Sequence, residues 1–132
     1  MKKAALWILG LLVALPVFYF ALAESGEVVV LETLDGADAQ ETRLWVTDHE
    51  GYAWLRTGDA GASWLARLRA NPDVAVTRGG QRGEFRAVIV TDPATRDAIN
   101  ALTLEKYGWR ERVLRAVMMD PAGVQPIRLE PR

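Results

Sequence analysis

The chain contains no cysteine and only one histidine among its 132 residues. Without cysteine it can form no disulfide framework and offers no acylation site for a lipoprotein anchor. The same shortage excludes an ordinary metal centre of histidine and cysteine ligands. His49 does lie between Asp48 and Glu50, but the side chains of neighbouring turn residues rarely point at one ion. The sequence therefore predicts no metal site.

Candidates for a catalytic nucleophile are also scarce, because the only serines are Ser25 and Ser63. A serine–histidine–aspartate triad would need Ser63 to meet His49, and nothing else in the sequence supports that pairing. The acidic residues form no recognisable pair for glycoside hydrolysis. A net charge of −1 gives no basic footprint for nucleic acid. If the protein is an enzyme, its difficult chemistry belongs to a bound organic cofactor.

The longest apolar run lies near the N-terminus, where Ala4–Ala23 carries no charge and follows Lys2 and Lys3. As a helix it would extend roughly 30 Å, the thickness of the hydrocarbon core of a bilayer. We expect residues 1–23 to anchor the chain in the cell membrane, with the domain outside the cytoplasm because the lysines come first. The tripeptide ending at Ala23 (Ala-Leu-Ala) also suits signal peptidase, so a secreted or periplasmic form cleaved there is the alternative. The run is longer than the usual core of a signal peptide, which favours the anchor.

Residues 24–132 are enough for one compact domain and too few for two. Short β-branched and apolar runs between turn residues predict six strands. These are Glu27–Thr33, Thr42–Thr47, Tyr52–Thr57, Asp73–Arg78, Glu84–Thr91 and Val124–Leu129. Three short helices are expected between them, ending at Asn71-Pro72, near Gly108 and before Asp120-Pro121. Asp92, followed by Pro93, is expected to cap the start of the second helix. The pattern predicts an α+β fold built as a small closed or partly open barrel.

The most informative stretch is Arg56–Val76, in which a strand passes through a glycine-containing loop into a short helix. Free backbone N–H groups and the positive end of a helix dipole suit an anion such as phosphate. Arg56 and Arg67 flank the turn, and we expect them to form the anion end of a ligand site with Gly58 and Ser63. The alternative is an ordinary loop that leads into a surface helix.

The helix and the segment after it carry a family resemblance. Trp64-Leu-Ala-Arg-Leu-Arg-Ala-Asn-Pro-Asp-Val-Ala-Val76 resembles the W-x-x-N-L-x-A-N-P-x-V-x-V segment of the deazaflavin- and flavin-dependent nitroreductase family. The similarity extends to Ala87–Pro93, Glu105–Trp109 and Pro126–Pro131. It implies a split β-barrel, related to the pyridoxamine-phosphate-oxidase-like flavin proteins, that holds FMN or coenzyme F420 and reduces nitro compounds, quinones or other unsaturated acceptors. The residues expected to contact the cofactor are Arg56, Thr57, Gly58, Ser63, Trp64 and Arg67.

Aromatic residues suggest where a flat ligand would lie. Tyr107 resembles the C-terminal tyrosines near the reactive ring in that family, which implies a catalytic hydroxyl that steadies negative charge on a substrate oxygen. The alternative is a tyrosine at a helix end that packs on the barrel. Trp45 and Trp54, on paired strands, form either a flat wall for an aromatic ligand or part of the core. Family barrels often build their site across a dimer interface, so the resemblance also implies a homodimer.

One turn departs from the family pattern. Where family members carry a basic Gly-Arg-Lys-Ser-Gly turn, this chain reads Leu34-Asp-Gly-Ala-Asp-Ala-Gln40, with two acids and no base. Because like charges repel, the polyanionic tail of F420 is disfavoured, and FMN or a flat ligand without phosphate is favoured. Two functions of different class follow. One is a membrane-anchored flavin or deazaflavin reductase, and the other is a split-barrel module without redox activity that binds a small ligand or a partner.

Overall fold

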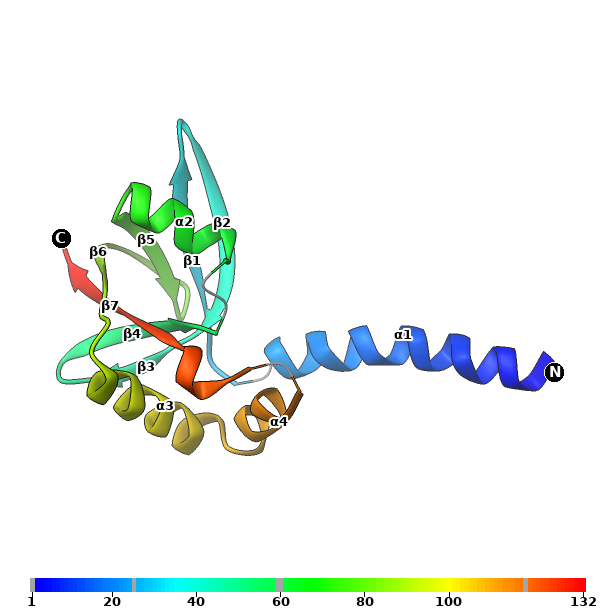
Figure 1. Cartoon of the computed structure of the whole chain (residues 1–132). Coiled ribbons are helices and arrows are strands. Elements are labelled where there is room, and N and C mark those ends of the chain that lie inside the picture. The colour runs from blue at the N-terminus through cyan, green and yellow to red at the C-terminus, as the bar shows by residue number, and fades with distance from the viewer. Residues whose placement is uncertain (1, 25, 59–60, 118) are drawn as a thin grey trace.

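The computed structural model describes residues 2–24, 26–58, 61–117 and 119–132 (Figure 1). A long N-terminal helix, α1 (Lys2–Glu24), extends away from a body built of strands and shorter helices. In chain order the body contains β1 (Val28–Asp35), β2 (Asp38–Trp45), β3 (Thr47–His49), β4 (Tyr52–Thr57), α2 (Ser63–Ala70), β5 (Asp73–Arg78), β6 (Gln81–Ile89), α3 (Pro93–Tyr107), α4 (Trp109–Val117), the 3-10 turn η1 (Pro121–Gly123) and β7 (Gln125–Pro131).

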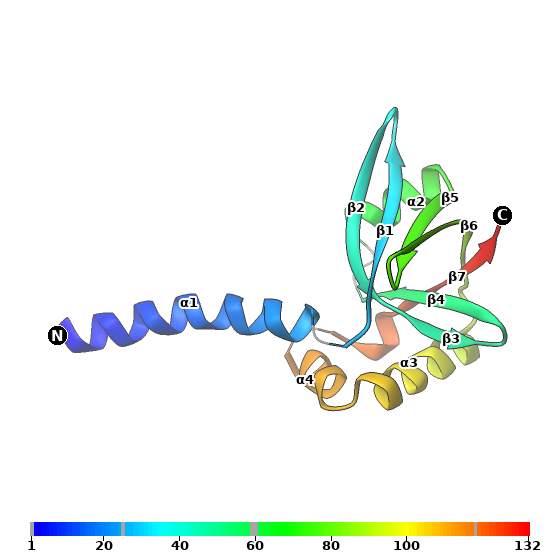
Figure 2. The ribbon, with the colours of Figure 1, turned by 180° about the vertical axis from the view of Figure 1, so that it is seen from behind.

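The strands of the described chain form one antiparallel sheet in the order β2-β1-β5-β6-β7-β4-β3. The sheet curls into a half-barrel, as the front and back views show (Figures 1 and 2). In β1 the side chains of Val29, Leu31 and Thr33 are fully buried at alternate positions, because successive side chains of a strand point to opposite faces. The predicted α+β barrel is confirmed, with seven strands in place of the expected six.

The additional strand arises at Val46. One strand was expected over Thr42–Thr47, but β2 ends at Trp45 and β3 begins at Thr47. The backbone groups of Val46 leave the sheet ladder for α3: its N–H donates to the Tyr107 hydroxyl at 3.0 Å, and its carbonyl accepts from Lys106 Nζ at 2.7 Å. The chain therefore turns here, from pairing with β1 to pairing with β4.

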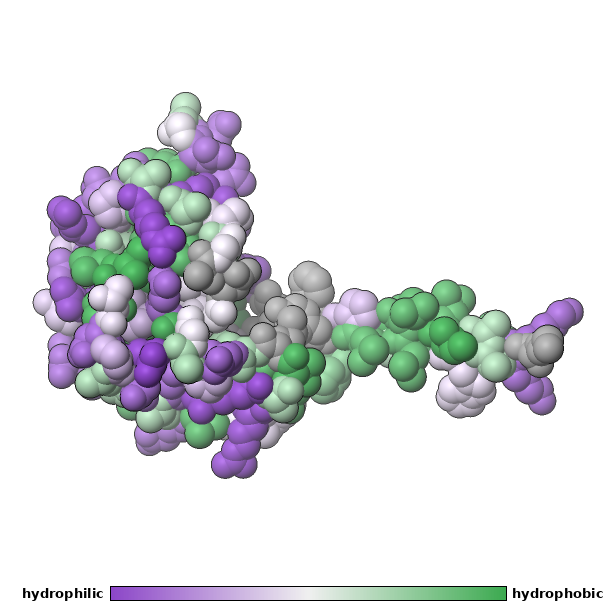
Figure 3. Space-filling view, viewed as in Figure 1, coloured by the Kyte–Doolittle hydropathy of each residue, from purple (hydrophilic) through white to green (hydrophobic). Residues whose placement is uncertain are grey.

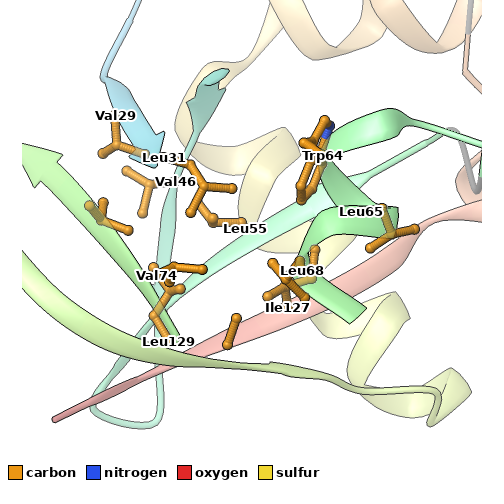
Figure 4. Packing of buried hydrophobic residues seen from close by; sticks show 12 residues of the cluster. Val29, Leu31, Val46, Leu55, Trp64, Leu65, Leu68, Val74, Ile127 and Leu129 are labelled. Atoms are coloured by element: carbon orange, nitrogen blue, oxygen red, sulfur yellow. The ribbon is translucent and has the colours of Figure 1, made fainter. Parts of the chain in front are cut away.

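Helix α2 packs its apolar side chains against those of the curled sheet (Figure 4). Trp64, Leu65 and Leu68 of this helix are buried in the same cluster as Leu55 and Ile127. The helix stops where Asn71-Pro72 was expected to stop it, with Asn71 in an extended conformation. Three side chains of one short helix thus fill the interior that a half-barrel would otherwise leave open.

The turn at Gly36 and the helix start at Asp92 both form as their residues predict. Asp35 pairs with Asp38 across a two-residue hairpin turn in which Gly36 has a φ of 62°, a conformation that glycine adopts without strain. Asp92 caps α3, because its side chain accepts from the N–H groups of Ala94 and Thr95.

Helix α1 has little contact with the body (Figures 1 and 3). Its apolar side chains are exposed, Leu6 to 68% and Trp7 to 79%. The side chains of residues 19–24, which include the possible cleavage site at Ala23, lie outside those that the structure describes. None of the helices, in the part of the chain that the structure describes, has the length and hydropathy of a membrane span.

Candidate functional site

Two neighbouring residues at the end of β4 point to opposite faces of the half-barrel. Leu55 belongs to the core cluster, so by alternation Thr57 shares its inward face, and Thr57 is buried. Arg56 points the other way, toward α3 and α4. Residues 59 and 60 of the turn that follows lie outside the described residues.

The side chain of Arg56 is 8% exposed and forms an ion pair with Glu111, whose side chain is fully buried. Arg56 Nη1 also donates to Oδ1 of Asn100 at 3.0 Å. Burial lowers the pKa of the Arg56 guanidinium, and its hydrogen bond to the Glu111 carboxylate opposes that shift. The charge that was expected to meet a phosphate is therefore balanced within the protein.

The ion pair belongs to a polar cluster between β4, α3, α4 and η1. Arg115 Nη2 lies 3.7 Å from Glu111 Oε2 and donates to the carbonyl of Asn100 at 2.8 Å. Asn100 Nδ2 in turn donates to the carbonyl of Pro121 at 2.9 Å. Sequence reasoning missed Glu111, which lies among arginines on a helix that looks solvated. The spacing of Glu111 and Arg115, one helical turn apart, is the only local sign of it.

Tyr107, the expected catalytic residue, is 2% exposed. Its hydroxyl accepts from Val46 N–H at 3.0 Å and lies 2.6 Å from the carbonyl of Glu27, to which it donates. Its ring stacks on Trp45, with centroids 4.2 Å apart and planes at 8°. Burial raises the pKa of this hydroxyl. The hydroxyl that was expected to face a substrate holds two backbone segments together.

The two predicted tryptophans also pack within the body, whereas Ser63 is exposed. Trp64 is 8% exposed and belongs to the core. Trp54 is buried, and its Nε1 donates to the carbonyl of His49 at 2.9 Å. Ser63 is exposed at the start of α2, which begins after Ala62 without a side-chain cap. A Cβ on Gly58 would lie 2.6 Å from Cγ of Met119, so Met119 packs against this part of the turn.

Arg67 borders a groove between the tip of the β1–β2 hairpin and the second half of α2. The groove has a volume of about 460 Å³. Arg67 is half-buried, and its Nε donates to Oγ1 of Thr33 at 2.8 Å, which fixes the guanidinium at the groove wall. Asp35 borders the same groove. The lining residues are Leu34, Asp35, Gly36, Ala66, Arg67, Ala70 and Asn71.

The predicted site residues thus separate into two regions. Arg56 belongs to the cluster under α3 and α4, whereas Arg67 reaches β1 from α2. The structure does not bring these two arginines to one anion. In the described part of the chain, no group of three or more histidine, aspartate or glutamate side chains gathers as a metal site.

Comparison with known proteins identifies the fold. No family model and no curated protein sequence matches the chain. Among solved structures, it is similar to a protein from Listeria innocua assigned as a pyridoxamine 5'-phosphate oxidase, with a TM-score of 0.61 and 17% identity over 89% of this chain and 94% of that one. It is similar to a FAD-binding protein from Mesorhizobium loti, with a TM-score of 0.58 and 11% identity over 88% of each chain.

A third similar structure is the haem storage protein HutZ from Vibrio cholerae, with a TM-score of 0.63 and 14% identity over 85% of this chain and 86% of that one. Another match is a domain-swapped dimer. At these identities the likeness shows the fold alone. The half-barrel is a split barrel of the pyridoxamine-phosphate-oxidase type, which occurs in flavin-binding and in haem-storing proteins.

Proposed function

We propose that this chain is a membrane-anchored oxidoreductase that binds a flavin-type cofactor and reduces flat acceptors such as nitro compounds or quinones. The observation that carries the proposal is the split barrel itself, shared over most of the chain with a FAD-binding protein. The Ala-Asn-Pro segment at the end of α2, typical of flavin and deazaflavin nitroreductases, adds to it.

The donors at the groove fit one phosphate better than several. Arg67 is the cation at its wall, and its Nε bond to Thr33 fixes the guanidinium there. Asp35 borders the same groove, and Asp38 pairs with Asp35 across the hairpin turn. One arginine can balance the compact phosphate of FMN, whereas the carboxylates of an F420 tail would meet two acids. We therefore favour FMN over F420.

A bound flavin would supply hydride transfer, which no side chain of the protein offers. Arg67 would hold and orient it at the groove. Ser63, at the other end of α2, does not line this groove, and its role in cofactor binding stays a prediction. Arg56 keeps its place as a site residue only if a ligand displaces Glu111, which would leave this fully buried carboxylate with only Arg115, 3.7 Å away, as a partner. Its role in binding stays a prediction.

The anchor is part of the proposal. An uncharged segment from Ala4 to Ala23, with exposed apolar side chains and two lysines in front, is typical of a helix that lies in a bilayer. We place the barrel outside the cytoplasm on the same grounds. Flotation of the full chain with lipid vesicles tests the anchor, and a soluble mature form that begins at Glu24 would establish cleavage instead.

The test of the cofactor is the absorbance of the full chain purified in detergent, followed by titration with FMN and with F420. Arg67→Ala is expected to weaken FMN binding about tenfold or more, because a charge-assisted hydrogen bond contributes roughly 1.5–3 kcal/mol. Arg69→Ala is the matched control, since Arg69 is exposed on the same helix and bonds Gln125 instead. If Arg67→Ala and Arg69→Ala bind FMN with equal affinity, the groove is not the phosphate site.

A second candidate function is a split-barrel module without redox activity that binds a small ligand or a partner. The committed hydroxyl of Tyr107 and the paired charge of Arg56 favour it, because neither group is free for chemistry in this arrangement. A colourless protein that also fails to bind added FMN or F420 would support this module. Its oligomeric state, which we expect to be a homodimer, is measured by light scattering on the same sample.

A further inference from the structure

Helix α4 has an outward face that the body does not cover. Glu111 is the one buried residue among those described in α4, and it is held by Arg56. Trp109 at the start of the helix is 54% exposed, and Val117 at its end is 74% exposed. Large apolar side chains left in water at both ends of a short helix are unfavourable unless something else contacts them.

The exposed charge on this helix is positive. Arg112 is exposed, and the Arg110 guanidinium lies 5.0 Å from the centre of the Trp109 ring. The one acid of the helix, Glu111, is turned inward and paired. Arginine and tryptophan together on the outer side of a helix suit the headgroup region of a membrane, where the indole meets the boundary of the acyl chains and the cation meets lipid phosphate.

The position of α4 matches this chemistry. Along the axis of α1, α4 lies level with the end of α1 that joins the body, and it is the labelled element of the body nearest that end in both views (Figures 1 and 2). The space-filling view shows apolar and strongly hydrophilic residues next to each other where α1 meets the body (Figure 3). With α1 in a bilayer, α4 would lie at the level of the headgroups.

We propose that α4 is a second membrane contact, which docks on the surface of a bilayer rich in anionic phospholipid through Trp109, Val117 and Arg112. This inference rests on the proposed anchor. α1 holds the chain at the membrane, and α4 fixes the orientation of the barrel against it. The barrel then presents one face to the lipid instead of turning on a single tether.

The absence of cysteine makes the test direct, because one introduced cysteine carries the only label. Full-length Val117→Cys, labelled with an environment-sensitive fluorophore, is reconstituted in vesicles of phosphatidylcholine alone and of phosphatidylcholine with phosphatidylglycerol. The label is expected to shift to shorter emission wavelengths only in the anionic vesicles. Leu34→Cys is the matched control: it is 41% exposed at the tip of the β1–β2 hairpin, away from α1, and its label should not respond.

Charge is tested in the same labelled chain. Arg112→Gln is expected to lower the ratio of docked to undocked α4 about fivefold, because one arginine near an anionic surface contributes about 1 kcal/mol. Arg86→Gln, an exposed arginine on β6, is expected to leave the ratio unchanged.

Four outcomes would overturn the inference. Equal emission of the Val117 label in neutral and anionic vesicles would show that α4 does not read anionic lipid. A shift that depends on protein concentration in detergent would assign the face to a second copy of the chain. Flotation with neither kind of vesicle would remove the anchor and this contact together, whereas flotation with both kinds and no label response would remove the contact alone.

Discussion

Replacing Glu111 by alanine is the sharpest test of how this barrel is held together. The change leaves the Arg56 guanidinium, 8% exposed, without its carboxylate partner. Breaking a buried ion pair from one side typically costs 3–5 kcal/mol, because the remaining charge stays in a medium of low dielectric. For a domain of about 100 residues each kcal/mol corresponds to roughly 4–8 °C, so the melting temperature should fall by at least about 12 °C.

The assay is thermal unfolding followed by tryptophan fluorescence, with the full chain in detergent. Asp97→Ala is the matched control, since it removes an exposed carboxylate from an ion pair with Arg96 on α3 and should cost less than about 1 kcal/mol. A double variant, Arg56→Met with Glu111→Leu, removes both charges and is expected to recover most of the lost stability. The buried pair would not be what stabilises the contact of β4 with α4 if Glu111→Ala lowered the melting temperature no more than Asp97→Ala. The same conclusion would follow if the double variant were no more stable than Glu111→Ala.

Three further predictions follow from particular contacts. Tyr107→Phe leaves the buried N–H of Val46 without its acceptor, so the free energy of unfolding in urea should fall by about 1–3 kcal/mol. Flavin binding should be unchanged, and weaker binding would show that the hydroxyl contacts the ligand. Replacing Asp35 and Asp38 by lysine should raise the affinity for F420 more than that for FMN, and equal gains in parallel titrations would contradict the charge argument. Hydrogen bonds to Arg78 and Lys106 lower the pKa of the Glu27 carboxyl below its ordinary value of 4.5. The stability that this carboxylate contributes is therefore present above pH 4.5 and is lost as the pH falls further, and Glu27→Gln should flatten this part of the plot of stability against pH.

Local sequence patterns predicted the parts of this fold that depend on neighbouring residues. Asn71-Pro72 ends α2, Asp92 begins α3, and the turn at Gly36 closes a hairpin, because each residue acts on its own backbone. The break between β2 and β3 was missed, because it is caused by Tyr107, which lies 61 residues from Val46 in the chain. A contact of that kind leaves no mark on the residues that it interrupts.

The candidate site was harder to predict than the fold for a related reason. Arg56 and Arg67 both flank a turn that suits an anion, so the sequence alone predicts the same anion-binding role for both. Two features distinguish them. Side chains alternate in β4, so Arg56 points away from the core, and there it pairs with Glu111 of α4, a helix far along the chain. An arginine that is paired inside the protein and one that borders a groove look alike until their partners are known.

Contacts made just after α1 show how this helix is joined to the barrel. Glu27 comes three residues after α1, and its carboxylate bonds Arg78 on β5 at 3.0 Å and Lys106 on α3 at 2.7 Å. Its carbonyl accepts from the Tyr107 hydroxyl. The chain is thus fixed to the barrel as soon as it leaves the helix, and a contact of α4 with lipid would add a second point.

A barrel held at two points meets acceptors in the bilayer always from the same side. Under the proposed function this geometry favours membrane quinones over soluble nitro compounds. Comparing the two substrates in vesicles and in detergent tests it, since only the quinone rate should depend on the bilayer.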